Sequence, residues 1–145
     1  MYQAILRSHS GLRWIVLILL IVTVINAFRK WKANEAFSNG DDKLSLFTLI
    51  FAHIQLILGF YLFAVSPKVM LKGLDMGNAI ARFFTVEHTL GMLIAIALIT
   101  IGRVQSKKLS GALKHKKIFM MYLIALILIL VSIPWPFRGL GAGWF

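Results

Sequence analysis

Three histidines lie inside long apolar runs of a chain of 145 residues that is 59% hydrophobic. At about 1.5 Å of helical rise per residue, His53 lies roughly 15 Å, His88 roughly 22 Å and His9 roughly 30 Å from the nearest basic cluster. Ionisable side chains are costly inside lipid and are therefore the first place to look for function. The fourth histidine, His115, stands among lysines, and we expect it to be a solvated loop residue.

Two imidazoles on different helices at similar depth can ligate a haem iron from the two faces of the ring. His53 and His88 are the predicted pair, both as cofactor-binding residues and as metal ligands, because they would bury the ring most deeply. His9 is the alternative to His53, since its difference in depth from His88 is about as large, roughly 7 Å. Met92 lies one turn from His88 and offers a thioether, which is also a haem ligand.

Arginines near the predicted outer edge of the membrane are candidates to bind the carboxylate groups of a haem. Arg13 and Arg82 are expected to bind the two propionates by charge-assisted hydrogen bonds. One of the two is also expected to pair with Glu87, because an unpaired carboxylate at the membrane edge is costly.

Other interpretations of the same polar residues stay open. Intramembrane histidines and glutamines also hydrogen-bond between helices as structural contacts, and Gln55 and Gly59 are expected to face away from the His53 ligand. Gly91 either admits a flat ring close to the backbone or forms a small-residue helix contact with Ala95. Zinc or copper is less favoured, because no carboxylate or sulfur cluster completes a site.

The elements that must position these residues are four apolar spans in one domain, residues 1–145. The spans are predicted at approximately 8–28, 44–66, 82–102 and 117–135, each near the length that crosses a bilayer as a helix. The apolar runs are continuous and do not alternate as barrel strands do. The predicted fold is therefore an all-α, integral membrane four-helix bundle with up-down-up-down topology.

No cysteine is present, which excludes disulfides, thiolate metal sites and covalent haem attachment.

The net charge of +11 is concentrated in short clusters between the apolar runs, so nucleic acid is not an expected partner. The linkers after the first and third spans carry ten of the sixteen positive residues, and the opposite side carries six. The positive-inside rule then predicts both linkers in the cytoplasm and both termini outside. The aromatic C-terminal segment from Pro134 fits an interfacial belt, with a partner-docking tail as the alternative.

Four segments carry a resemblance over nearly the whole chain: His9–Trp14, Phe51–Gln55, Phe83–His88 and Ser132–Arg138. They resemble small bacterial inner-membrane proteins labelled cytochrome b. The resemblance implies haem b on His9, His53 and His88, and electron transfer with quinone or a redox protein as a partner. It implies an electron carrier or redox subunit more than a stand-alone enzyme. A homo- or hetero-oligomer is a candidate assembly that the sequence does not decide. A cofactor-free subunit of a larger complex and a small transporter or metal-handling protein remain as alternatives.

Overall fold

The computed structural model describes all residues, 1–145, and every regular element in it is helical. The elements are α1 (Tyr2–Lys32), α2 (Asn39–Val65), α3 (Ala79–Arg82), the π-helical turn η1 (Phe83–Glu87), α4 (His88–Ser106), α5 (Gly111–Ser132) and the 3₁₀ turn η2 (Pro136–Arg138). Because α3, η1 and α4 follow one another without a break, they form one long helix. The all-α prediction is confirmed.

Four helices are long and apolar enough to cross a membrane, and they indicate a multi-pass membrane protein. They are Tyr2–Lys32, Asn39–Val65, Ala79–Ser106 and Gly111–Ser132. A helix suits lipid because its backbone hydrogen bonds are satisfied within the segment. α2 ends directly before Ser66-Pro67, at the predicted boundary of the second span, and α5 ends just before Pro134.

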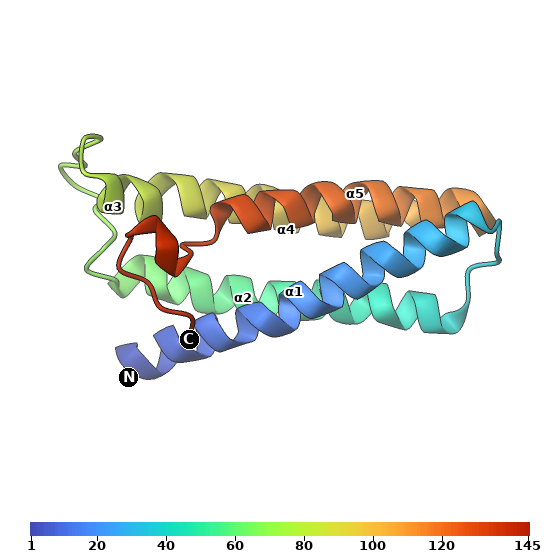
Figure 1. Ribbon diagram of the computed structural model, residues 1–145, viewed down its shortest axis with the longest axis horizontal. Helices are drawn as coiled ribbons and strands as arrows, with labels where there is room; N and C mark the ends of the chain where they lie inside the picture. The colour runs from blue at the N-terminus through green and yellow to red at the C-terminus, as the bar shows by residue number, and fades with distance from the viewer.

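The helices form a bundle in which α1 packs on α2 and α5, while α4 packs on α5 and α2. α1 and α4 therefore face each other across the diagonal of the bundle. Figure 1 shows both chain termini at one end, together with the segment 66–78. We call this the terminal end, and we call the opposite end, which holds segments 33–38 and 107–110, the basic end.

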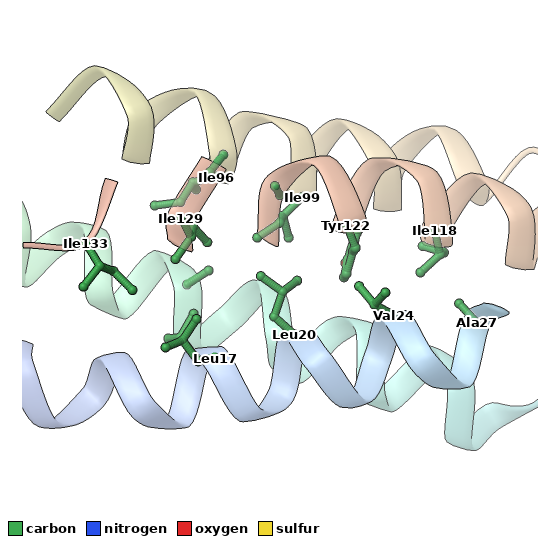
Figure 2. Packing of buried hydrophobic residues seen from close by; sticks show 14 residues of the cluster. Leu17, Leu20, Val24, Ala27, Ile96, Ile99, Ile118, Tyr122, Ile129 and Ile133 are labelled. Atoms are coloured by element: carbon green, nitrogen blue, oxygen red, sulfur yellow. The ribbon is translucent and has the colours of Figure 1, made fainter. Parts of the chain in front are cut away.

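The middle of the bundle is filled by a cluster of buried apolar side chains (Figure 2). Leu17 and Leu20 of α1 point toward Ile129 and Tyr122 of α5, and Ile99 of α4 completes the layer. Leu20, Ile99 and Tyr122 have no exposed surface at all. Close packing of this kind is the main force that holds helices together once they are in lipid.

α4 and α5 approach each other so closely that two positions of α4 admit only glycine. A Cβ atom at Gly91 would overlap the hydroxyl of Ser132, and one at Gly102 would lie 2.6 Å from Cβ of Met121. The structure therefore supports the helix-contact interpretation of Gly91, because Ser132 of α5 takes the space beside it.

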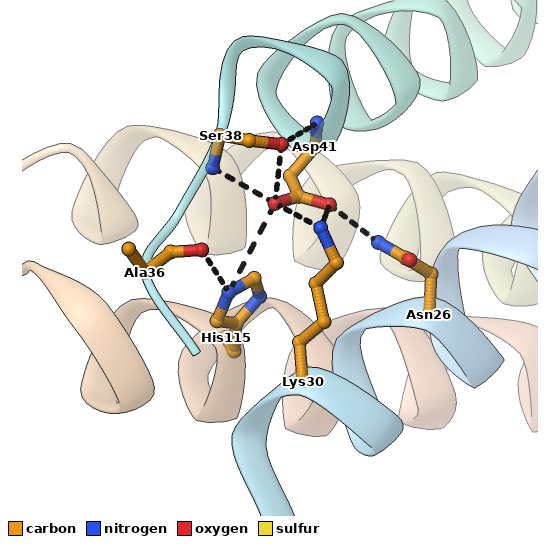
Figure 3. Close-up of polar contacts among 6 residues, drawn as sticks. All are labelled: Asn26, Lys30, Ala36, Ser38, Asp41 and His115. Carbon is orange, nitrogen blue, oxygen red and sulfur yellow. Dashed lines mark hydrogen bonds and ion pairs between the residues drawn. The ribbon is translucent and has the colours of Figure 1, made fainter. Parts of the chain in front are cut away.

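The basic end is held by the carboxylate of Asp41, which has polar contacts with Asn26, Lys30, Ser38 and His115 (Figure 3). Asp41 forms a capping box with Ser38 at the start of α2, and its carboxylate accepts hydrogen bonds from Lys30 Nζ at 2.9 Å and Asn26 Nδ2 at 2.7 Å. His115 was expected to be solvated, and that expectation is wrong. It is 0% exposed, with Nε2 at 3.4 Å from the carbonyl of Ala36 and 4.0 Å from Asp41 Oδ2.

A second polar group joins α2, α4 and α5 at the same end. Arg103 was expected in a basic linker, but it lies on α4, is 8% exposed, and binds the Asp42 carboxylate at 3.1 Å. Its guanidinium also donates to Ser45 Oγ, while the hydroxyl of Tyr122 donates to the Ser45 carbonyl at 3.1 Å. The linker between α4 and α5 is correspondingly short, residues 107–110, because the surrounding basic residues continue both helices.

The Gly91 contact gives a stability prediction. Gly91→Ala should destabilise the bundle by about 1–3 kcal/mol, because the added methyl overfills the α4–α5 contact. Thermal unfolding followed by circular dichroism in detergent measures the change.

Gly11→Ala is the matched control, since nothing lies within 4 Å of its added Cβ. It should be neutral or stabilise by up to about 1 kcal/mol. Gly91→Ala combined with Ser132→Gly should recover part of the loss, and a Gly91→Ala protein as stable as the parent would contradict the packing argument.

Candidate cofactor site

The terminal end of the bundle encloses a cavity of about 210 Å³ that is lined mainly by apolar side chains. All four long helices and the C-terminal tail, residues 139–145, contribute to its wall. Its polar lining residues are few, and they include His9, Gln55, His88, Arg13 and Lys68. An apolar cavity with a small number of convergent polar groups is the usual form of a cofactor or ligand site.

His9 and His88 face each other across the diagonal of this cavity. Their ring centroids are 6.3 Å apart and their planes are inclined by 70°. Nε2 makes no hydrogen bond within the protein in either ring, so both nitrogens are available to a ligand. The structure thus brings together the alternative histidine pair of the sequence analysis.

His88 is fixed by its surroundings on α4 and α5. Its Nδ1 lies 2.8 Å from the carbonyl oxygen of Ser132. Because a carbonyl oxygen only accepts hydrogen bonds, the proton of the neutral ring is on Nδ1, and Nε2 keeps its lone pair. Metal-binding histidines almost always have such a second partner. The π-helical turn η1 ends directly before His88, and the Phe83 and Phe84 rings lie 5.9 and 6.3 Å from the imidazole.

His9 is held against α2 by Gln55 and Gly59, two residues that were expected to face away from a ligand of His53. Gln55 Nε2 donates to the His9 carbonyl at 2.8 Å, and a Cβ at Gly59 would lie 3.3 Å from His9 Cε1. Gln55 and Gly59 both line the cavity, whereas His53 does not, which agrees with the expectation that they face away from the His53 side of α2. Gly59 leaves the room that the His9 ring occupies.

His53 does not line this cavity. Its Nδ1 lies 2.8 Å from the carbonyl of Leu49, one turn back on the same helix. The pairing of His53 with His88 stays a prediction, and the arrangement of the side chains favours His9 in its place. Met92, the other expected ligand, does line the cavity one turn from His88.

Arg13 and Arg82, the two arginines expected at the cofactor site, have different surroundings in the structure. Arg82 binds Glu87 at 2.7 Å, which confirms that Glu87 is paired with one of the two expected arginines. Arg82 does not line the cavity. Arg13 does line it, together with Lys68, which the sequence analysis did not single out. Burial lowers the pKa of Lys68 below the ordinary value of a lysine.

The C-terminal tail folds back over the cavity and is tied to these two cations. Arg13 donates to the carbonyl of Trp144 at 2.6 Å, and Lys68 donates to the carbonyl of Gly141. Trp14 adds a hydrogen bond to the same Trp144 carbonyl at 3.1 Å and stacks on its ring at 6.3 Å. The aromatic tail is therefore part of the cavity wall.

The site can be tested for its fit to a metal held by two imidazoles. Two nitrogens bonded to one metal ion at about 2 Å place the ring centres about 6 Å apart, and the observed separation is 6.3 Å. No group of three or more His, Asp or Glu side chains gathers anywhere, so the protein offers no complete cage for a bare metal ion. Three buried polar atoms of cavity residues have no protein partner: His9 Nδ1, Arg13 Nε and Gln55 Oε1. Two imidazoles without further protein ligands fit a metal that brings its own equatorial ligands, as haem iron does.

Comparisons with protein-family models, with curated proteins and with solved structures gave no match to this chain.

The tail contacts give the second prediction. Arg13→Ala with Lys68→Ala should loosen the tail, because two of the three side-chain hydrogen bonds to its carbonyls are lost and only that of Trp14 remains. Carboxypeptidase should then remove the terminal Phe145 and Trp144 several-fold faster. Mass spectrometry of the intact protein follows the trimming. Arg7→Ala with Lys72→Ala removes two exposed positive charges from the same end and should leave the rate unchanged. Equal trimming of both double variants would show that the two ties do not hold the tail.

Proposed function

We propose that this chain is a membrane electron-transfer protein that holds a b-type haem between His9 and His88. The observation that carries the proposal is the spacing of these two rings across the bundle diagonal, in residues that line an apolar cavity and whose Nε2 atoms make no hydrogen bond within the protein. The residues that gave the cytochrome b resemblance include both histidines. The class of activity is that of an electron carrier or redox subunit in the bacterial inner membrane.

Bound haem would supply reversible one-electron chemistry at its iron. The residues of the chain hold and tune the group. Ser132 keeps the His88 lone pair on the cavity side through the Nδ1 hydrogen bond. Arg13 and Lys68 bring positive charge to the cavity wall, where carboxylate groups of a ligand can accept charge-assisted hydrogen bonds. Phe84, Leu93 and Ile133 line the wall and exclude water from the cofactor.

The proposed topology is up-down-up-down, with the terminal end outside the cytoplasm. Its support is the distribution of charge, because ten of the sixteen positive residues lie in the helix ends and the linker at the basic end, and the other six lie toward the terminal end. The haem site then lies in the outer half of the membrane. An electron partner would be a quinone dissolved in lipid or a redox protein on the outer side.

The haem proposal predicts the spectra of three histidine variants. Protein expressed with sufficient haem should show a reduced-minus-oxidised b-type spectrum. His9→Ala and His88→Ala should each abolish it, because each removes one of two axial ligands.

His53→Ala is the matched control and should keep the spectrum, because His53 lies outside the cavity. Loss of haem in the His53 variant with retention in the His9 variant would restore the pair predicted from the sequence. A parent protein with no haem band would refute the cofactor and favour a cofactor-free subunit.

The proposed orientation has a separate test that uses the absence of native cysteine. Single cysteines at Glu35 and Ser110, both exposed at the basic end, should resist a membrane-impermeant thiol reagent in intact cells. A cysteine at Met76, which is 56% exposed in the segment 66–78, should react. Labelling of the first two with protection of the third would reverse the topology.

A further inference from the structure

A second apolar hollow lies far from the histidines, on the outer face of the seam between α1 and α5. Its volume is about 300 Å³ and its lining is entirely apolar: Val24, Ile25, Phe28, Phe119 and Leu123. Ile25 and Phe28 are 54% and 42% exposed, so the hollow opens sideways from the bundle. In a membrane protein this face meets lipid acyl chains. We call it the α1–α5 groove.

An aromatic cluster closes the groove toward the basic end. Phe28 and Phe119 lie 5.1 Å apart, and the indole of Trp31 lies 6.2 and 5.6 Å from their ring centres. Trp31 lies one turn beyond Phe28 on α1, so its ring is at the level where a span meets the interface. Tryptophan prefers this level because one end of its side chain is apolar and the other is polar.

Two lysine ammonium groups converge on that indole ring. Lys32 Nζ lies 4.2 Å from the centre of the Trp31 ring, and Lys116 Nζ lies 5.5 Å from the same centre. Neither lysine takes part in any of the four ion pairs of the protein, and both are exposed. Two like charges on one ring, without a carboxylate partner, form a site for an external anion.

We propose that this groove and its lysine pair bind one anionic phospholipid. An acyl chain lies in the α1–α5 groove, and the headgroup phosphate accepts hydrogen bonds from Lys32 and Lys116. The charge of the lysines selects an anionic lipid, since basic side chains at the cytoplasmic interface attract anionic headgroups by about 1 kcal/mol each. An anion without an apolar chain would leave the groove unused. The proposal needs insertion in a membrane but does not depend on haem.

Native mass spectrometry of the detergent-purified protein tests this with phosphatidylglycerol and phosphatidylcholine of identical acyl chains. Phosphatidylglycerol should bind at least tenfold more tightly. Lys32→Ala with Lys116→Ala should weaken phosphatidylglycerol binding about 30-fold and remove the preference. Lys32→Arg with Lys116→Arg should keep it, because the charge is retained.

The matched control is Lys107→Ala with Lys108→Ala, which removes two exposed charges from the same end without touching Trp31 or the groove. It should bind phosphatidylglycerol as the parent does. An equal loss in both double alanine variants would mean diffuse attraction and would overturn the site.

A further pair of variants tests whether an acyl chain lies in the groove. Ile25→Trp should fill the groove and weaken both lipids, whereas Ile18→Trp, at a 60% exposed position of α1 outside the groove, should change neither. An unchanged affinity in the Ile25 variant would overturn the acyl-chain part of the proposal. Inorganic phosphate at millimolar concentration should not displace phosphatidylglycerol, and displacement would show that the lysines bind a bare anion instead.

Discussion

The close approach of α4 and α5 is the constraint on which the arrangement of the site depends. Gly91 lies directly against Ser132, and Ser132 in turn provides the carbonyl oxygen that holds His88 Nδ1. If the two helices moved apart, that hydrogen bond would lengthen and the imidazole would be free to rotate. One glycine on α4 therefore sets both the packing of the pair and the direction in which the lone pair of His88 points.

The two ends of the bundle use polar residues in opposite ways. At the basic end, Asp41 is bonded to Lys30 and Asn26, and Asp42 is bonded to Arg103, so these polar groups connect the helices. Nδ1 of His115 is the one buried side-chain atom at that end without a partner. At the terminal end, buried atoms of His9, Arg13 and Gln55 are left without partners around a cavity. Buried unpaired groups lower stability. A well-bonded basic end allows the bundle to tolerate a terminal end that is shaped for a ligand.

The fold was predictable from sequence because apolar runs of bilayer length have few structural outcomes. The ends of α2 and α5 followed from Ser66-Pro67 and Pro134, since proline removes a backbone donor. The burial of His115 was not predictable from its position among lysines. Those lysines lie on the outer faces of α5, while His115 turns inward toward Asp41, a residue 74 positions earlier in the chain. Only the arrangement of the helices in the bundle, which brings the start of α2 opposite α5, reveals this contact.

The site was predictable in composition but not in arrangement. Counting residues gives the depth of a side chain along a helix, and by depth alone His9 and His53 are equal candidates to oppose His88. The direction of a side chain around the helix axis depends on which helices are neighbours, and the sequence does not give that order.

Because α1 lies diagonally opposite α4, a residue of α1 meets His88 across the centre of the bundle. α2 presents Gln55 and Gly59 to the cavity and turns His53 away. The π-helical turn before His88 shifts the direction of that ring once more, and no residue of Phe83–Glu87 is by type a signal for such a turn. The chemistry of the site thus follows from residue types, whereas its geometry follows from the order of the helices in the bundle.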